Sequence, residues 1–385
     1  MTVASGFMIP LNEKDWISSG DRSNNWCGDP LIATYLNENI FLQGANVFTT
    51  PEGEAVKIQV GIQGVVEPPN VEPATNLGVV QHVQAWVCYP NTSNQPHPGL
   101  LVPSMQGLNP AWTGSHVLEG VDPTSNPEAY QDVGGQAPSF VYFLASLSPQ
   151  WIPTAEDLVP PNQTGYCCIF ATCQGLAPAV QDGDGGYLGD GVGTFVPPNA
   201  DPSSLIDICT SPYQGQRNIA IVYDRVRVSG SNLLQFGFLA VGSSVGRPKQ
   251  VVLEVTPVRQ LGQVDPAVLR VLKAGPHRDL PLQPASSGLK GLRLSKNTYE
   301  CKGYLARIIL EAEEIAEEVI EALEHPFRHT SRLRLKLPPK GIQPMLLTVE
   351  LDASLPPGSV HTFDITQTDE TGKRGGIRVA AIVVP

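Results

Sequence analysis

The stretch Val56-Lys57-Ile58-Gln59-Val60-Gly61-Ile62-Gln63 alternates apolar and polar residues without a break. Because successive side chains of a β-strand point to opposite faces of its sheet, this pattern predicts a strand with one buried face. Comparable apolar runs follow at residues 80–89, 140–147, 166–173, 218–228, 233–241 and 251–258. Such a series of strands, separated by long Pro- and Gly-rich segments, predicts an elaborated β-sandwich over residues 1–260.

The composition also favours strands and loops over helices. Charged residues make up only 16% of the chain, whereas Gly (37) and Pro (36) are abundant turn-formers. Hydrophobic residues make up 41%, which is enough to build real cores, and a length of 385 residues predicts more than one domain.

A change of composition after residue 260 predicts a connector over residues 261–296. Residues 267–273 follow Asp265-Pro266 and precede Gly275-Pro276, which is the punctuation of a short helix. Residues 275–295 contain no Phe, Trp or Tyr and predict an extended arm rather than a core element.

The remaining residues, 297–385, predict a small β domain packed on one helix. From Leu305 to Leu323 apolar residues recur at three-four spacing, which predicts an amphipathic helix. Alternating strand patterns return at residues 333–337, 347–351, 360–365 and 377–384. The fold class is therefore mostly β, with a large sandwich, a helical connector and a small C-terminal β domain.

One segment of the large sandwich resembles a known family. The segment from Trp151-Ile152-Pro153 to Tyr166-Cys167-Cys168-Ile169-Phe170-Ala171, with the strands at 218–224 and 234–241, resembles bacterial immunoglobulin-like modules of the CARDB-like type. The resemblance implies a β-sandwich that mediates binding or spacing. It implies no catalytic residue, and a likeness of fold alone does not settle function.

Charge and hydropathy exclude several classes of function. A net charge of −12 argues against nucleic acid as the main partner, because neutralising phosphates needs a surplus of Lys and Arg. No apolar run reaches the ~18 residues of a membrane span. Residues 1–5 lack the features of a signal peptide, so we expect a cytoplasmic chain, with non-classical release as the alternative.

The seven cysteines are expected to be reduced and mostly buried thiols. Cys167, Cys168 and Cys173 fall on one predicted strand, where small buried hydrophobes are a better interpretation than a zinc site. Asp182, Asp184 and Asp190 resemble the start of a calcium loop.

That acidic loop departs from an EF-hand, because Gly186 and Gly193 stand where further ligands are needed. An irregular Ca²⁺ site and a flexible acidic turn therefore both remain open, and no other cofactor is expected. Gly242-Ser243-Ser244-Val245-Gly246 fits the nucleophile-elbow pattern, but a β run rather than a helix follows it. A glycine-rich loop is the better interpretation, and an unrecognised hydrolase ranks as the third hypothesis.

Charge is segregated near the C-terminus. Residues 300–324 hold eight Glu against Lys302 and Arg307, a net charge of −6, and residues 325–343 carry +5 without any acid. The charges either pair locally and face water, or the acidic face of one subunit meets the basic strand of a neighbour. The candidate interaction residues are Glu313, Glu314, Glu317, Glu318, Glu321, Arg328, Arg332, Arg334 and Lys336.

The leading hypothesis is a non-enzymatic structural or interaction protein, a subunit of a homo-oligomeric or larger assembly whose partners are itself or other proteins. The alternative is a monomeric binding module for carbohydrate or protein ligands. Trp112, together with Trp86, Trp151 and Tyr187, could supply a stacking platform for such ligands, or these rings could anchor the core and its loops.

Overall fold

The computed structural model describes residues 6–9, 11, 33–44, 55–65, 78–118, 140–157, 168–176, 180–181, 187–188, 191–223, 226–228, 231–242, 249–258, 262–265, 268–269, 272, 279–296, 331–339, 341–372 and 374–385. These residues form a mostly β fold, as the sequence predicts, and none of their helices reaches seven residues. Short 3-10 turns stand at Pro98–Leu100, Pro103–Met105, Ala155–Asp157 and Pro202–Ser204. The predicted amphipathic helix at 305–323 lies outside the described residues.

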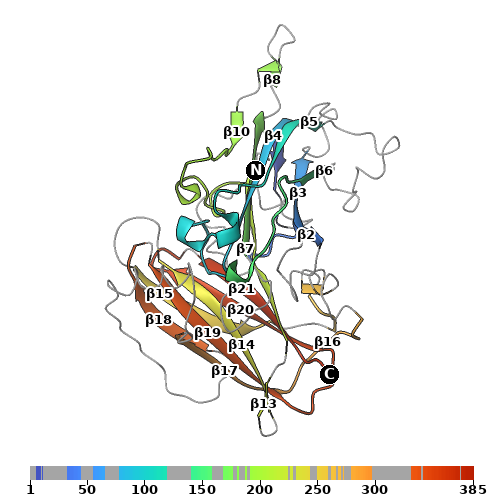
Figure 1. The fold of residues 1–385 in the computed structure, drawn as a ribbon, viewed down its shortest axis with the longest axis vertical. Helices are drawn as coiled ribbons and strands as arrows, with labels where there is room; N and C mark the ends of the chain where they lie inside the picture. Colours follow the sequence, from blue (N-terminus) through green and yellow to red (C-terminus); the bar gives the residue numbers. More distant parts are fainter. Residues whose placement is uncertain are drawn as a thin grey trace.

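The N-terminal sandwich consists of two antiparallel sheets (Figure 1). Sheet A contains β1 (Gly6–Met8), β2 (Ile40–Gly44), β3 (Val56–Val65) and β6 (Phe140–Ser146). Sheet B contains β4 (Gly78–Cys88), β5 (Ala111–Leu118), β7 (Cys168–Leu176), β10 (Gly191–Gly193) and β11 (Gln214–Arg217). A two-stranded ribbon of β8 (Val180–Gln181) and β9 (Tyr187–Leu188) lies at the far end.

The core of this sandwich confirms the strand predicted from residues 56–63. Val60 and Ile62 of β3 are fully buried, as is Val83 of β4 in the facing sheet. The polar face of β3 is covered as well, because Gln59 and Gln63 are each only 5% exposed. A strand buried on both faces is more than the alternating pattern predicts.

The C-terminal sandwich also consists of two sheets. Sheet C has the order β13 (Val226–Val228), β14 (Ser231–Val241), β19 (Ile342–Asp352), β17 (Leu289–Lys296). Sheet D has the order β12 (Ile219–Tyr223), β21 (Arg374–Ile382), β20 (Ser359–Asp369), β15 (Lys249–Pro257), β18 (Ser331–Leu337), and β16 (Gln283–Pro284) also pairs with β20. Phe236, Phe238, Leu253, Leu347 and Phe363 fill the space between the two sheets.

Strand pairing divides the chain differently from the expected boundary at residue 260. β14 pairs with β19 along its whole length, and β15 lies between β18 and β20. The strands predicted to close the first module therefore belong to the second sandwich, which begins after Asn218. Hydrophobic periodicity shows that a strand exists but does not show which strand it pairs with, and this explains the difference.

The expected arm over residues 275–295 also needs correction. Residues 289–296 form strand β17, and Leu292 and Leu294 contribute to the core at 7% and 9% exposure. A bulge between Leu289 and Gly291 interrupts the alternation, so the strand is hard to recognise in the sequence. Within the predicted short helix, residues 268, 269 and 272 are helical.

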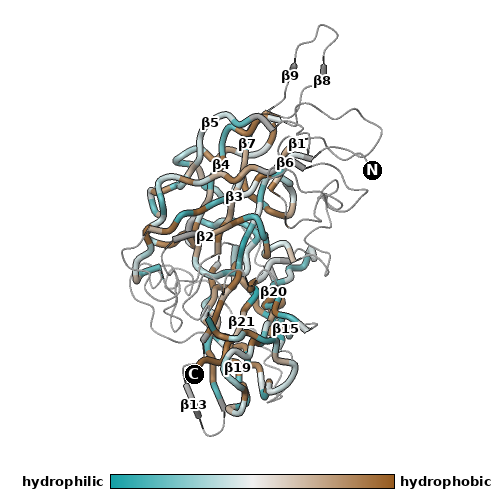
Figure 2. Tube along the Cα trace, turned by 90° about the vertical axis from the view of Figure 1, so that its right-hand side faces the viewer, coloured by the Kyte–Doolittle hydropathy of each residue, from teal (hydrophilic) through white to brown (hydrophobic). Residues whose placement is uncertain are grey.

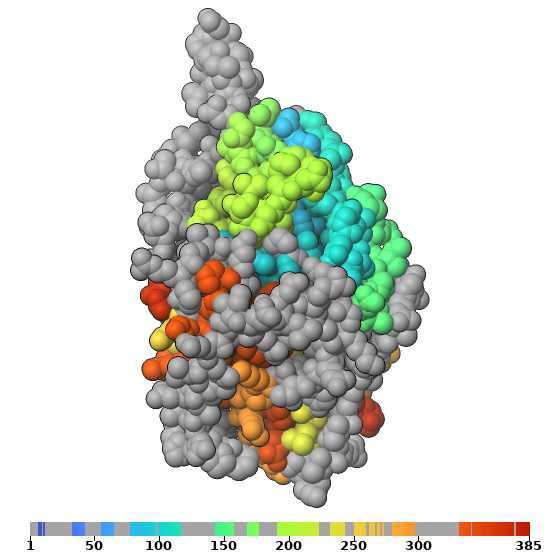
Figure 3. All heavy atoms as spheres, turned by 60° about the vertical axis from the view of Figure 1, so that its left-hand side comes forward, coloured from blue at the N-terminus to red at the C-terminus, as the bar shows by residue number. Residues whose placement is uncertain are grey.

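The two sandwiches lie end to end (Figures 1 and 2). The hydrogen-bond partners of Asn218 place this residue at their junction. Figure 3 shows the N-terminal sandwich, in blue to green, above the C-terminal one, in yellow to red. The side chain of Asn218 is fully buried, and its Nδ2 donates to the carbonyl oxygens of Asn91 at 2.5 Å and Gly376 at 2.7 Å. One amide thus connects a loop of the first sandwich to a strand of the second.

A second buried contact strengthens the junction. The backbone N–H of Thr92 donates to the carbonyl of Leu239 at 3.0 Å, and its hydroxyl donates to Oε1 of Gln367 at 2.6 Å. The Nε2 of Gln367 donates in turn to the carbonyl of Val241 at 2.7 Å. The close approach requires Gly375, because a Cβ at this position would lie 2.2 Å from the carbonyl oxygen of Thr92. Satisfied buried polar groups of this kind favour one fixed arrangement of the sandwiches.

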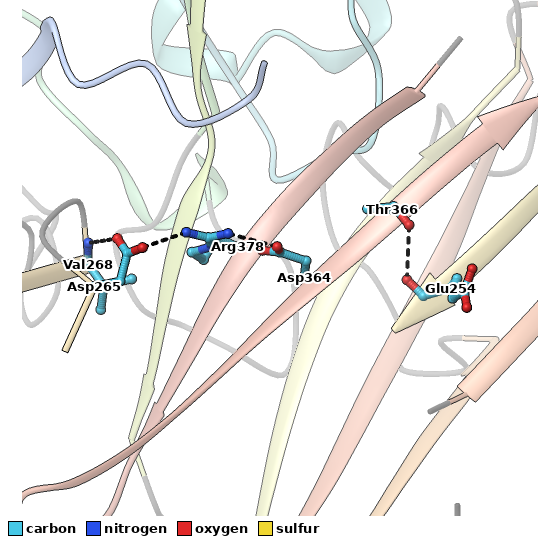
Figure 4. Close-up of polar contacts among 6 residues, drawn as sticks. All are labelled: Glu254, Asp265, Val268, Asp364, Thr366 and Arg378. Atoms are coloured by element: carbon cyan, nitrogen blue, oxygen red, sulfur yellow. Dashed lines mark hydrogen bonds and ion pairs between the residues drawn. The ribbon is translucent and has the colours of Figure 1, made fainter. Parts of the chain in front are cut away.

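A buried ion-pair cluster holds the connector on the outer face of sheet D (Figure 4). Arg378, only 9% exposed, donates two hydrogen bonds of 2.8 Å to the carboxylate of Asp364 and one of 2.7 Å to Asp265. Asp265 also accepts from the backbone N–H of Val268, at the start of the helical residues. The two carboxylates raise the pKa of the guanidinium, so Arg378 stays charged despite its burial.

Candidate interaction surfaces

The sequence-predicted cations of β18 form a row on the surface, which we call the basic stripe (Arg332, Arg334 and Lys336). All three side chains are exposed, and the residues between them, Leu333 and Leu335, are buried in the core. β18 is the last strand of sheet D and pairs only with β15 among the described strands. The predicted alternation of this strand is therefore confirmed. Because the leucines are buried in the core, the side chains of the cations lie on the opposite, exposed face of the strand.

On the neighbouring strand β15, one acidic residue faces the basic stripe. Glu254 of β15 lies opposite Arg332, Val252 lies opposite Arg334, and Gln250 is the neighbour of Lys336. Neither Arg332 nor Lys336 forms an ion pair with any residue that the structure describes. In a chain with a net charge of −12, the stripe is thus a local positive surface.

A second surface lies on the N-terminal sandwich and contains Trp112, which the sequence analysis singled out. We call this surface the aromatic edge (Trp112, His116 and Phe143). The ring of Phe143 lies 5.1 Å from that of Trp112, edge to face, and stacks on His116 at 4.1 Å. All three rings are partly exposed. They come from β5 and β6, the edge strands of sheets B and A, and a β-bridge between Ala111 and Ser148 lies next to them.

Glycine shapes the aromatic edge. Trp112 lies along β5 over Gly114, where an added Cβ would come within 3.0 Å of the indole ring. The absence of a side chain at Gly114 therefore leaves room for the indole to lie flat along the strand. Trp112 also packs against the core, so it serves at once as a lid of the sandwich and as part of its surface.

The other predicted tryptophans are anchors. Trp151 is fully buried, and its Nε1 donates to Oγ of Ser104 at 2.8 Å. Trp86 is 4% exposed in the same core. Tyr187 lies on β9, outside the residues whose side chains are described. Of the proposed platform, Trp112 alone is therefore shown at a surface.

The buried carboxyl group of Asp157 forms hydrogen bonds that connect two loops. It accepts from the hydroxyl of Ser104 at 2.5 Å and from the backbone N–H of Thr154 at 2.7 Å, and burial raises its pKa. No histidine hydrogen-bonds to this pair among the described residues, so the acid and the hydroxyl pin two loops together instead of forming a nucleophile and its base. The Gly242 motif also differs from a nucleophile elbow, because strand β15 begins at Lys249, where the elbow needs a helix.

The cysteines differ in part from the expectation of reduced thiols. Cys88, Cys168 and Cys173 are buried and form no disulfide, and burial raises the pKa of the Cys168 thiol to about 12, which makes it inert. Cys209, however, is disulfide-bonded, and its partner lies outside the described residues. Sequence spacing alone could not show this, since the spacing of cysteines does not determine which of them pair.

Several predicted site residues lie outside the described part of the chain: Asp182, Asp184, Asp190, Glu313, Glu314, Glu317, Glu318, Glu321 and Arg328. Within the described part, no group of three or more His, Cys, Asp or Glu could hold a metal ion. That same part contains no helix long and apolar enough to cross a membrane. The possible calcium loop stays a prediction.

No protein-family model matches the chain, and no curated protein matches it significantly. Among solved structures, the chain is similar to the collagen adhesin of S. aureus, with 9% identity, 92% of this chain and 96% of that chain covered, and a TM-score of 0.21. The CupB6 tip adhesin from Pseudomonas aeruginosa is 12% identical, with 89% of this chain and 93% of that chain covered, and has a TM-score of 0.20. A bacterial adhesin from Mobiluncus mulieris is 7% identical, with 90% of this chain and 98% of that chain covered, and has a TM-score of 0.21. Matches at this level carry no argument about ligands, and the CARDB-like resemblance of residues 151–171 stays a prediction.

Proposed function

We propose that the chain is a non-enzymatic interaction protein and a subunit of a homo-oligomeric or larger assembly. The observation that carries this proposal is the basic stripe, a row of exposed cations on an otherwise acidic chain. The same chain holds the Glu-rich residues 311–324, so each copy brings both signs of charge. Complementary patches on one chain support association between copies.

The junction at Asn218 supports this role. Two sandwiches joined by buried hydrogen bonds present their surfaces at a fixed separation. A preorganised body loses less conformational freedom on binding than two sandwiches on a flexible linker would lose. This rigidity favours a subunit that repeats at regular spacing over a pair of independent domains.

Size-exclusion chromatography with light scattering tests the proposal at two ionic strengths. At about 0.05 M salt the charges act over more than 10 Å, whereas near 1 M the screening length falls to about 3 Å. We expect particles larger than one chain at low salt and single chains of 41.3 kDa at high salt. A single chain at every protein concentration and both ionic strengths would contradict the assembly.

The aromatic edge supports a second candidate, a monomeric binding module for carbohydrate or protein ligands. Partly exposed rings on two edge strands offer a stacking surface for an apolar sugar face or a side chain. If the surface binds, Trp112→Ala abolishes retention on a glycan or protein array in addition to any loss of stability from its core packing. If Trp112 acts only as a lid of the core, the same substitution lowers thermal stability and leaves retention unchanged.

The disulfide of Cys209 supports a location outside the reducing cytoplasm. Disulfides persist mainly in oxidising compartments, so we propose that the mature protein functions there after release. Mass spectrometry of protein alkylated directly in cell and medium fractions tests this. A Cys209 that is alkylated without prior reduction in every fraction would contradict it.

A further inference from the structure

We propose that Cys88 and Cys168 form a second disulfide, which joins strands β4 and β7 when the chain folds in an oxidising environment. The structure holds the reduced state, in which neither cysteine forms a disulfide. The inference rests on the proposed location outside the reducing cytoplasm and is independent of the assembly. It follows from the register of the two strands, from the backbone hydrogen bonds next to Cys88 and from the burial of both thiols.

The two cysteines lie directly opposite each other on neighbouring antiparallel strands. In the register of β4 and β7, Cys88 is the partner of Cys168. Residues that face each other across an antiparallel pair carry their side chains on the same side of the sheet. The two sulfur atoms therefore share one face, and no change of register is needed to bring them together.

Backbone hydrogen bonds fix the spacing of the pair. On its other side Cys88 is bridged to Leu101, and the residues that flank Cys88 form the hydrogen bonds of this bridge, as when the backbone N–H of Tyr89 donates to the carbonyl of Leu100 at 2.8 Å. The N–H and C=O of Cys88 therefore point toward β7, which makes Cys88 and Cys168 a hydrogen-bonded pair. The Cα atoms of such a pair are about 5.5 Å apart, inside the range of about 4.4–6.8 Å that disulfides span.

The side chains need only a small adjustment to form the bond. The Cβ atoms of facing residues lie about 4.5–5.5 Å apart, whereas those of a disulfide lie about 3.5–4.5 Å apart. The two strand ends must therefore approach each other slightly. A bond formed under this constraint is reduced more readily than an unstrained structural disulfide once a reductant reaches it.

The bond needs an oxidant, and its chemical class is a low-molecular-weight disulfide such as oxidised glutathione. The thiolate of one cysteine attacks a sulfur of the oxidant, which forms a mixed disulfide and releases one thiol. The thiolate of the other cysteine then attacks the protein sulfur of the mixed disulfide and releases the second thiol. The chain loses two hydrogen atoms, and the oxidant is reduced to two thiols that carry the two protons.

Burial limits this exchange to the time before the sandwich closes. Both cysteines are fully buried, and the Nε2 of Gln216 donates to the sulfur of Cys168 at 3.1 Å. Burial also raises the pKa of the Cys168 thiol to about 12, so the folded chain holds hardly any thiolate there. Exchange therefore takes place during folding, and the folded pair keeps the redox state in which the chain folded.

The disulfide lies close to the junction of the two sandwiches. Asn91 follows Cys88 by three residues, and its carbonyl accepts the hydrogen bond of Asn218. The bond closes a long covalent loop from Cys88 to Cys168, which restricts the unfolded chain more than the folded one. We therefore expect the oxidised chain to unfold at a higher urea concentration than the reduced chain.

Refolding of the reduced full-length chain in a mixture of oxidised and reduced glutathione tests the bond. After refolding, the remaining thiols are alkylated in denaturant without a reductant, and the digested chain is analysed by mass spectrometry. We expect a linked pair of peptides, one with Cys88 and one with Cys168, and a loss of alkylation at both cysteines. Fragmentation of this wild-type pair distinguishes Cys168 from the adjacent Cys167, so the assignment does not depend on a variant that folds.

Cysteine variants supply the controls. Cys173→Ala is the matched one and should keep the linked pair, because Cys173 is equally buried on β7 but lies opposite Val83. Cys88→Ala and Cys168→Ala should each abolish the linked pair. The same glutathione mixture added to the folded, reduced wild type should leave both thiols unmodified, and rapid formation of the bond there would overturn the proposed order of events.

Alkylation of both Cys88 and Cys168 in the refolded wild type, or a bond from Cys88 to a different cysteine, would overturn the disulfide. The refolding experiment supplies its own oxidant. Its failure therefore leaves the proposed location and the assembly standing, since each of these has a separate test.

Discussion

Replacing Asn218 by Asp tests the junction with an almost isosteric change. The buried amide of Asn218 donates to the carbonyl oxygens of Asn91 and Gly376 at 2.5 and 2.7 Å. An ionised carboxylate donates no hydrogen bond, so both carbonyls would face an oxygen instead of an N–H. A buried acceptor without a partner costs about 1–3 kcal/mol, so we expect the free energy of unfolding to fall by about 3–5 kcal/mol at pH 7.

The pH dependence distinguishes this mechanism from simple loss of packing. Burial and two facing carbonyls would raise the pKa of the new carboxyl group above the value of about 3.9 in the unfolded chain. The penalty therefore grows as pH rises above the unfolded pKa and is complete only above the raised pKa of the folded state. As pH falls toward 4 the acid becomes protonated and can donate a hydrogen bond again. We expect the difference from wild type to shrink between pH 7 and pH 4.

Urea unfolding followed by tryptophan fluorescence and circular dichroism measures both effects. Gln343→Glu is the matched amide-to-acid control, because its half-buried Nε2 bonds only to the carbonyl of Pro344 at 3.1 Å, and we expect a change below about 0.5 kcal/mol. A loss below about 1 kcal/mol in Asn218→Asp, or a loss that stays constant with pH, would refute the role assigned to this amide.

Three further predictions follow from the described contacts. Gly375→Ala should destabilise by about 2 kcal/mol or more in thermal unfolding, because its Cβ would lie 2.2 Å from the carbonyl of Thr92, whereas Gly191→Ala, with open space around it, should be neutral. His361 is 6% exposed, and burial lowers its pKa to about 4. The free energy of unfolding of the wild type should therefore fall by about 3 kcal/mol as pH falls from 6.5 to 4, because the unfolded chain binds the proton first. The His361→Gln variant should not show this loss. Alkylation of the unfolded chain should label Cys209 only after reduction, and labelling without a reductant would contradict its disulfide.

The sequence predicted which segments are strands much better than how these strands pair. The alternation at 56–63 and 333–337 gave β3 and the basic stripe, because one buried face leaves a period of two in the sequence. Pairing depends on contacts between residues that are distant in the sequence, so hydrophobic periodicity could not predict that β14 pairs with β19. The domain boundary differs from the expected one for this reason.

The candidate surfaces show the same difference between local patterns, which the sequence predicts, and contacts between distant residues, which it does not. Trp112 and the stripe could be named from the sequence, since large aromatics in loop-rich segments and cations alternating with leucines are local patterns. His116 and Phe143 could not, because they join Trp112 only through the approach of two edge strands from different sheets. β5 itself was missed because Gly114 and Ser115 interrupt its apolar pattern.

Scanning calorimetry in high salt, where the chain should be monomeric, distinguishes one rigid body from two linked ones. If the buried junction at Asn218 couples the sandwiches, they unfold together in one transition whose calorimetric and van't Hoff enthalpies agree. Two separate transitions in the wild-type chain would contradict that coupling.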